Sequence, residues 1–300
     1  MGWRLTAVAL CACSARLAQP TNANHDSPDA SGGQIDGTSA NGDGPLGAWG
    51  TPTAINGADD PTISQDDCTL NSKATELYFK KAGPAGDIDL FVMTRTTVND
   101  PWGAPAQAAA LDSAMDEESP RLSNDDLTIY FGRDGAIYQS TRATTSSPWG
   151  TPTAVTQINT GTYNKWLATC VNNNVTYFMV SRAVSRGMTS DQDLIIGVLD
   201  GSDAGTDSSL SATGSNEISA FLSPDCLSAS FASNRSGQTQ LYTASRQDPT
   251  QDFGPAAGPD MDYGPATDNE DLWISGDSRT SVFASIRGGD TNKALYISTR

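Results

Sequence analysis

The hexapeptide WGTPTA occurs at residues 49–54 and again at residues 149–154, and a related stretch, WGAPAQA, begins at Trp102. Between the copies at Trp102 and Trp149 lies a longer unit. In this unit SPRLSNDD is followed by LTIYF and then by AIYQSTR. These short runs are rich in aromatic and β-branched residues and are separated by Asp, Gly and Ser. Such a pattern indicates β-strands joined by tight turns.

The same unit can be followed along most of the chain, which indicates a repeat architecture. Its five copies begin near Asp60, Ser119, Trp166, Ile218 and Asp271. The fifth copy ends at the last residue of the chain without its final strand, whereas WGTPTAI precedes the first copy as a strand without a unit. A ring explains both facts, because the early strand then completes the last blade and no sheet edge stays exposed.

The sequence therefore predicts an all-β fold, a five-bladed β-propeller over residues 47–300. In this fold, residues 49–55 form a strand that pairs with the strand at residues 294–299, and Trp49 takes the place in the last blade that Trp102 holds in the first. The recurring Trp is expected to pack between blades, since large aromatic side chains contribute much of the energy of a core.

The unit SP.LS.DG..LYF.S.R…..LY.A.R…W..P resembles the WD40-like repeat called PD40, which is found in TolB-like β-propellers and in bacterial surface lipoproteins. The resemblance covers residues 49–300. The Gly of the family's SPDG turn is replaced in this chain by Asp67, Asp126, Asn173 or Asn174, Cys226 and Ser278. Family members often have six or seven blades, whereas five copies are counted here.

The N-terminus has the order of a secretory signal, with Arg4 followed by a short apolar run and small residues. Leu10-Cys11-Ala12-Cys13 resembles a bacterial lipobox, which implies a signal peptide at residues 1–13 and lipidation of Cys13. Residues 14–46 are polar and lack large apolar side chains, so they are predicted to form a disordered tether. The expected location is the outer membrane or cell surface, or the periplasm if the protein is not displayed.

Composition narrows the classes of function. The formal net charge is −17, which disfavours nucleic-acid binding. His25 is the one histidine and lies outside the repeats, so the folded region has no Ser-His-Asp or Cys-His catalytic pair and no histidine metal ligand. A G-x-S-x-G elbow is absent as well. On these grounds no catalytic residue is assigned. No cofactor is expected either, and a bound Ca²⁺ is the weaker alternative.

Acidic residues recur just before each expected innermost strand. They are Asp59, Asp60, Glu117, Glu118, Glu217, Asp268, Glu270 and Asp271, and the third copy has Asn164 and Lys165 instead. Their recurrence with the repeat favours a role as turn residues. Converging carboxylates also bind calcium, which gives a candidate metal site at Asp60, Glu118, Glu217 and Glu270. A third interpretation is a carbohydrate-active enzyme that uses channel carboxylates as acid and base.

Three cysteines lie in the repeats, and all three are expected near the turn after the first strand of their copies. Copies three and four are adjacent, so Cys170 and Cys226 are candidates for a disulfide, which suits an exported protein. The alternative is that Cys68, Cys170 and Cys226 are all buried free thiols.

The family resemblance and the lack of a catalytic set lead to the expectation of a non-enzymatic, monomeric propeller that binds a protein, peptide or glycan at the cell envelope. It would touch the membrane only through its lipid anchor. The alternative is a glycoside hydrolase-like enzyme with carboxylates at the propeller channel.

Overall fold

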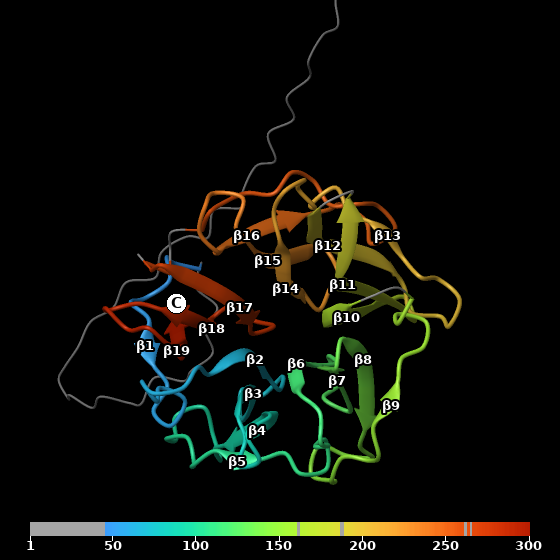
Figure 1. The fold of residues 1–300 in the computed structure, drawn as a ribbon. Helices are drawn as coiled ribbons and strands as arrows, with labels where there is room; N and C mark the ends of the chain where they lie inside the picture. The colour runs from blue at the N-terminus through green and yellow to red at the C-terminus, as the bar shows by residue number, and fades with distance from the viewer. Residues whose placement is uncertain (1–45, 161–162, 187–188, 261–262, 265) are drawn as a thin grey trace, which may run out of the picture. The chain divides into compact units, whose positions relative to one another are not determined.

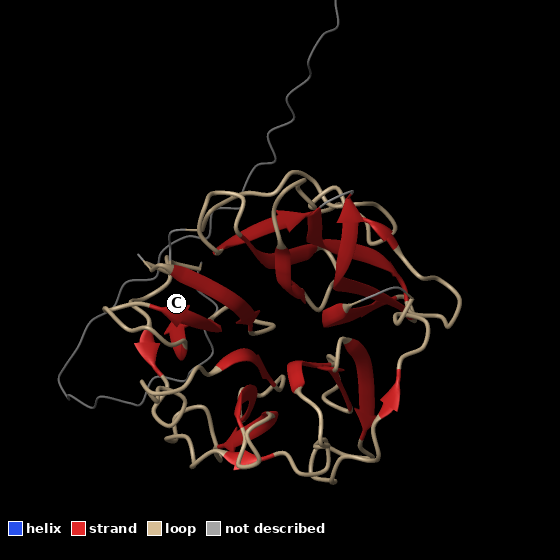
Figure 2. Cartoon of the chain, viewed as in Figure 1, coloured by secondary structure: helices blue, strands red, loops and turns tan. Residues whose placement is uncertain are grey.

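The computed structural model of the protein describes residues 46–160, 163–186, 189–260, 263–264 and 266–300. These residues form five small antiparallel sheets arranged around a common centre (Figures 1 and 2). Each sheet is one blade, so the predicted five-bladed β-propeller is confirmed. No helix in the described part of the chain is long and apolar enough to cross a membrane.

The strands of each blade follow one another in the sequence, from the innermost to the outermost, except in the fifth blade. The first blade contains β2 (Asp66–Leu70), β3 (Glu76–Ala82), β4 (Ile88–Thr94) and β5 (Ala106–Gln107). The second contains β6 (Glu117–Leu122), β7 (Thr128–Arg133), β8 (Ala136–Thr141) and β9 (Thr153–Ala154). The third contains β10 (Asn164–Asn172), β11 (Val175–Arg186), β12 (Thr189–Val198) and β13 (Thr206–Asp207). The fourth contains β14 (Glu217–Leu222), β15 (Ser228–Ser233) and β16 (Gln240–Ser245).

The fifth blade joins the two ends of the described chain. It contains β17 (Asp268–Ile274), β18 (Thr280–Ile286), β19 (Ala294–Thr299) and, as its outer strand, β1 (Thr53–Ala54). In β1, Thr53 lies opposite Ile297 and Ala54 opposite Tyr296. The backbone N–H of Gly50 donates to the carbonyl of Thr299 at 2.9 Å. The predicted closure is confirmed (Figure 1), although the regular strand is shorter than residues 49–55.

A recurring aromatic-Gly pair, Trp-Gly in three blades and Phe253-Gly254 in the fourth, closes the outer edge of four blades. The backbone N–H of Gly50, Gly103, Gly150 and Gly254 donates to a carbonyl at the end of the neighbouring third strand, at 2.8–2.9 Å. A Cβ at any of the four would lie 3.0–3.2 Å from that same carbonyl oxygen, which explains why only glycine occupies the position. The close approach of this backbone to the third strand therefore accounts for the glycine of the motif.

The aromatic residue of the motif stacks on an arginine. The guanidinium groups of Arg95, Arg142 and Arg300 lie 4.2, 4.4 and 4.1 Å from the rings of Trp102, Trp149 and Trp49. In the fourth blade, Arg246 lies 4.3 Å from Phe253. Trp49 therefore takes the predicted place in the last blade, and each aromatic ring gains a cation–π contact.

Five phenylalanines at equivalent places on the second strands fill the space between blades. They are Phe79, Phe131, Phe178, Phe231 and Phe283, each at most 1% exposed. The register explains this burial, because each blade places the same strand position against its neighbour. The LTIYF and ELYF runs are thus strands buried on both faces, as their dense apolar pattern predicts.

Each innermost strand carries a β-bulge, where its register against the second strand shifts. One bulge residue in each blade has a positive φ between 52° and 60°; these residues are Asp67, Ser119, Trp166, Ser219 and Asp271. Non-glycine residues rarely adopt this conformation. Bulges re-aim side chains and are frequent beside functional sites.

The first repeat copy differs from its predicted alignment. The turn between its first two strands is formed by residues 71–74, with Ala74 at a φ of 51°. Asp66 and Asp67 lie instead on the innermost strand β2. Asp67 was wrongly aligned with the turn residues Asp126, Cys226 and Ser278, because ISQDD resembles the LS.DD of the second copy.

Cys170 and Cys226 are joined by a disulfide with an S–S distance of 2.07 Å. Cys170 lies in β10 and Cys226 in the turn after β14, so the bond links the third and fourth blades. Cys68 is buried and free on β2, not near a turn. The predictions about the signal peptide, Cys13 and nearly all of the tether concern residues outside the described ranges.

Candidate active site at the propeller mouth

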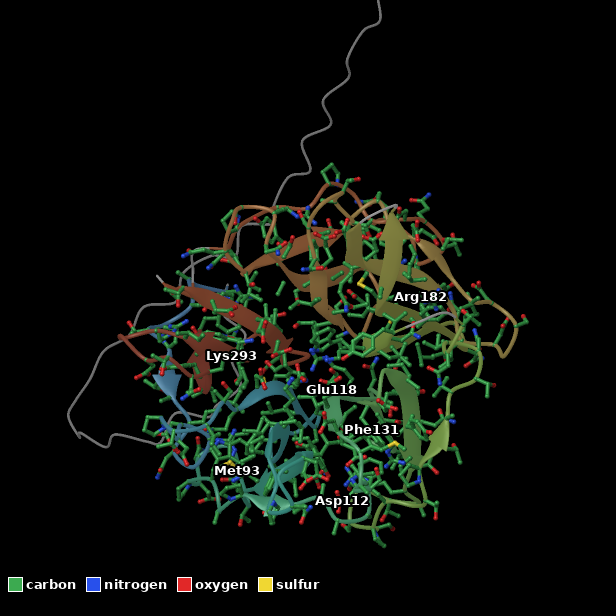
Figure 3. All side chains as sticks on the ribbon, viewed as in Figure 1. Met93, Asp112, Glu118, Phe131, Arg182 and Lys293 are labelled. Carbon is green, nitrogen blue, oxygen red and sulfur yellow. A yellow bond between two sulfur atoms is a disulfide. The ribbon has the colours of Figure 1, made fainter. Side chains whose placement is uncertain are left out.

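The innermost strands begin at one mouth of the ring, and their bulges bring charged side chains together there. We call these residues the mouth cluster: Asp66, Asp67, Lys80, Glu118, Lys165, Asp268, Glu270, Asp271 and Lys293. Figure 3 places Glu118 near the centre of the ring and Lys293 on the fifth blade. Carboxylates from three blades thus meet at one site.

Asp67 is the most firmly held carboxylate of the mouth cluster. Its side chain is fully buried and lies 2.8 Å from the Nζ of Lys80. The indole N–H of Trp166 donates to it at 2.7 Å, and the backbone N–H of Ser119 at 3.0 Å. Complete burial disfavours the charged form, but the charge of Lys80 and these hydrogen bonds hold the pKa of Asp67 well below its ordinary value.

Glu118 lies between two lysines. Its carboxylate is 2.6 Å from the Nζ of Lys165 and 3.6 Å from that of Lys80. The hydroxyl of Tyr163 also donates to it, at 3.2 Å. Two ammonium groups therefore compensate the negative charge of Glu118, and its side chain keeps some exposure at the mouth, about 12%.

Asp66 faces Glu118 across Lys80. The Nζ of Lys80 lies 3.6 Å from one oxygen of each carboxylate, so these oxygens are separated by no more than twice that distance. Burial raises the pKa of Asp66, and the neighbouring charge of Asp67 adds to the shift. The two carboxyl groups therefore lie close together, and each also has a second lysine beside it, Lys293 at 3.5 Å from Asp66 and Lys165 at 2.6 Å from Glu118.

The fifth blade supplies a second group of carboxylates around Lys293. The Nζ of Lys293 contacts Glu270 and lies 3.5 Å from Asp66 and 3.7 Å from Asp268. Burial raises the pKa of Glu270 well above its ordinary value, and the charge of Asp271 adds to this effect. One ammonium group compensates only part of the charge of three carboxylates, so this side of the mouth favours protonated carboxyl groups.

Asp271 lies deeper and connects the fifth blade to the first. One of its oxygens accepts the backbone N–H of Asp67 at 2.7 Å, and the other lies 3.6 Å from Arg121 without a hydrogen bond. Burial and the charge of Asp67 raise the pKa of Asp271 to about 7. Asp67 and Asp271 thus occupy neighbouring blades at equivalent bulges, with pKa values shifted in opposite directions.

The four carboxylates predicted to bind calcium do not share one site. Glu118 and Glu270 belong to the mouth cluster, whereas Asp60 lies in an exposed loop and binds Thr62. Glu217 is buried inside the fourth blade, 3.0 Å from Arg235. Within the described residues, these four do not form a group at metal-ligand spacing. The misaligned first copy explains the choice of Asp60, since Asp66 holds the place equivalent to Glu118.

Two lysines of the mouth cluster, Lys80 and Lys293, carried no signal in the sequence, whereas Lys165 stood out at the acidic position of the third copy. Lys80 lies at the end of the buried pattern of β3, and Lys293 precedes β19. Neither recurs in the other copies.

Three cavities of the described residues lie away from the mouth cluster, including one of about 340 Å³ beside Tyr177 and Arg246. One of about 150 Å³ lies at the opposite ends of the innermost strands, beside Arg121 and Trp273. Another of about 560 Å³ lies between the fourth blade and the C-terminal Arg300. None of the three is lined by Asp66, Glu118 or Glu270. The chemistry of the carboxylates, not cavity volume, identifies the mouth cluster as the candidate site.

No protein-family model matches the sequence, and no curated protein matches it either. Solved structures do share its fold. An α-L-arabinofuranosidase from Podospora anserina is 11% identical with a TM-score of 0.57, covering 84% of this chain and 96% of its own. An endo-1,4-β-xylanase from Bacteroides thetaiotaomicron is 10% identical with a TM-score of 0.54, covering 78% and 90%. A TolB-like protein from Agrobacterium tumefaciens is 14% identical with a TM-score of 0.50, covering 84% and 85%.

These comparisons support a TolB-like propeller as the coarse fold and correct the functional expectation. A non-enzymatic binding propeller was predicted, yet glycoside hydrolases predominate among the similar structures. At identities of 9–11% the likeness concerns the fold. The prediction failed because it treated the recurring acids as turn residues, whereas several of them lie on the inner strands at the mouth.

Proposed function

We propose that this protein is a glycoside hydrolase-like enzyme whose active site is the mouth cluster. The observation that carries the proposal is the pair formed by Asp66 and Glu118, which flank Lys80 at 3.6 Å each. Glycoside hydrolases use two carboxyl groups roughly 5 to 10 Å apart, one as acid and one as base or nucleophile. The upper limit set by Lys80 is compatible with this range.

The environments assign the two roles. Asp66 has a raised pKa, so it is suited to hold the proton that passes to the glycosidic oxygen as the bond to the leaving group breaks. Glu118 has its charge compensated by Lys165 and Lys80, so it is suited to accept a proton from the attacking water. The oxygen of the water bonds to the sugar carbon as the bond to the leaving group breaks; Asp66 loses one proton to the leaving group, Glu118 gains one from the water, and proton exchange with solvent restores both groups. The charge of Lys293, 3.5 Å from Asp66, opposes this protonation and instead stabilises the carboxylate that remains once the proton has passed to the leaving group.

Hydrolysis of chromogenic glycosides tests the proposal, with arabinofuranosides, xylosides and galactosides as substrates together with arabinoxylan. We expect one of these to be cleaved by the wild type, and Asp66→Asn and Glu118→Gln each to lower the rate by about 10²- to 10⁴-fold. The matched control is Asp60→Asn, which changes an exposed loop carboxylate and should leave the rate unchanged. If the wild type cleaves none of them, or if both variants remain fully active, the assignment is wrong.

We infer that the blades are copies of a PD40-type repeat. The support is the recurrence of one strand order and one bulge around the ring, and of one aromatic-Gly edge contact in four of the five blades.

We also propose that the protein is exported and lipidated at Cys13. The support is the Leu10-Cys11-Ala12-Cys13 segment and the polar stretch that follows it. Metabolic labelling with a radioactive fatty acid should label the wild type and not Cys13→Ser. Equal labelling of the two proteins would rule out a lipid anchor at this position.

A further inference from the structure

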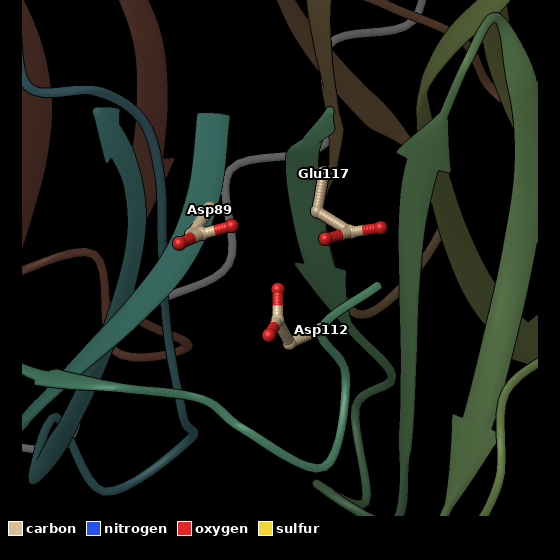
Figure 4. A group of neighbouring side chains, drawn as sticks. All are labelled: Asp89, Asp112 and Glu117. Atoms are coloured by element: carbon tan, nitrogen blue, oxygen red, sulfur yellow. The ribbon is translucent and has the colours of Figure 1, made fainter. Parts of the chain in front are cut away.

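A second group of carboxylates lies away from the mouth, between the first and second blades. It consists of Asp89 on β4, Asp112 in the connection from β5 to β6, and Glu117 at the start of β6. One oxygen from each of the three lies within 4.8 Å of the others. Figure 4 shows the three side chains converging on the space between the two blades. We call these residues the inter-blade carboxylates.

Asp89 is buried without a full set of partners. Its residue is 1% exposed, and its Oδ2 accepts a hydrogen bond from the side-chain amide of Gln107 at 2.8 Å. Its Oδ1 is buried and has no hydrogen-bond donor. Gly83 backs the carboxylate so closely that a Cβ there would lie 1.7 Å from Oδ2. The side chain is therefore held in place with one oxygen that lacks the partner that burial normally demands.

The charges of the group are also incompletely compensated. Glu117 is fully buried and lies 2.7 Å from the guanidinium of Arg133. Among the described ion pairs, none involves Asp89 or Asp112. Three carboxylates and one guanidinium leave two negative charges in one small space. Facing carboxylates can only accept hydrogen bonds when ionised, so they require either a shared proton or a cation between them.

We propose that the inter-blade carboxylates bind a calcium ion that joins the first and second blades. All three potential ligands are carboxylate oxygens, which suits a hard cation and not zinc, and the two uncompensated charges match a divalent ion. Oxygens on opposite sides of Ca²⁺ lie up to about 5 Å apart, which is compatible with three oxygens that all lie within 4.8 Å of one another, and three carboxylates exceed the one or two that usually hold Mg²⁺. Asp112 is exposed, so ions can enter there and water molecules can complete the coordination.

This site differs from the calcium site expected from the sequence, which included Glu118 but not Glu117. Glu117 and Glu118 are adjacent on β6 and point to opposite sides of it, so that Glu118 belongs to the mouth cluster and Glu117 does not. An ion at Glu117 would fix the start of β6 against β4. The inference does not depend on the proposed enzymatic function.

Calorimetric titration of the full-length protein with calcium chloride, after removal of metal with EDTA, tests the proposal. We expect one saturable site in the wild type, and a rise in melting temperature of at least about 5 °C when calcium is saturating. Asp112→Asn should weaken the affinity for calcium at least about tenfold, because one charged ligand is lost. Since Asp112 is exposed, this variant is expected to fold. Asp248→Asn, in an exposed loop of the fourth blade, is the matched control and should bind as the wild type does.

Three outcomes would overturn the proposal. The wild type could release no heat of binding, or Asp112→Asn could bind calcium as tightly as the wild type. Magnesium could also bind with equal affinity, which would contradict the assignment to calcium. If calcium does not bind and Asp89→Asn is more stable than the wild type in EDTA, the carboxylates share a proton instead.

Discussion

At the scale of single residues, the mouth depends on a left-handed backbone conformation that its bulge residues adopt at a cost in free energy. Five non-glycine residues at the bulges have φ values near +55°, and two of them are the buried aspartates Asp67 and Asp271. A left-handed backbone costs a non-glycine residue about 1–2 kcal/mol. Here the bulge turns Asp67 towards Trp166 and Lys80. The fold thus accepts local strain where it positions charged groups.

Two serines allow this strain to be measured. Ser219 and Ser230 are 1% and 2% exposed, and both have a buried hydroxyl without a partner. Ser219 has a φ of 60°, whereas Ser230 lies in the regular strand β15. Replacement by glycine removes the same atoms at both positions. Ser230→Gly should lower the free energy of unfolding by about 1 kcal/mol, while Ser219→Gly should leave it unchanged or raise it, because glycine tolerates positive φ.

Urea unfolding followed by tryptophan fluorescence would measure both variants. An equal loss of stability at the two positions would show that the bulge conformation of Ser219 costs nothing.

At the scale of elements, four of the five blades end in the same edge contact. The arginine after the third strand stacks on the aromatic ring, and its Nε donates to the carbonyl of a turn residue with positive φ: Arg95 to Ala74, Arg142 to Asp126, Arg246 to Cys226 and Arg300 to Ser278, at 2.7–2.8 Å. The third blade lacks this contact, and there Asp203 accepts the backbone N–H of Val198. The repeat pattern therefore encodes the outer edge and its turn together.

Strands and blade count could be predicted because they depend on local pattern, repeated at similar spacing. The mouth cluster could not, because its contacts join residues far apart in sequence; Asp67 and Asp271 are separated by 204 positions. Lys80 and Lys293 occupy positions that do not recur, so the repeat hid them. Because the turn of the first copy was misaligned, Asp60 was predicted as a metal ligand in place of Asp66. The sequence shows where acidic residues lie but not where a strand forms a bulge.

At the scale of the whole ring, stability depends on one short segment. Ile55 is 2% exposed and belongs to the apolar cluster between the fifth and first blades. Trp49 packs against Tyr263, with ring centroids 5.8 Å apart, and lies beneath Arg300. The backbone of Ala58 accepts a hydrogen bond from Leu295. Residues 49–58 therefore serve both the last blade and the first.

Deletion of residues 1–56 should destabilise the entire propeller, whereas deletion of residues 1–44 should leave its melting temperature unchanged. The longer deletion removes β1 and exposes β19 as an edge that would invite association between chains. It also removes the partly buried Trp49 and the buried Ile55, and truncating a buried side chain of the size of Ile55 costs about 2–5 kcal/mol. Because a domain has only about 5–15 kcal/mol of stability, this loss affects every blade. Thermal unfolding by circular dichroism, with light scattering for association, compares the two truncated proteins. Equal melting temperatures would mean that the ring holds without β1, and that its innermost strands alone keep the mouth cluster assembled.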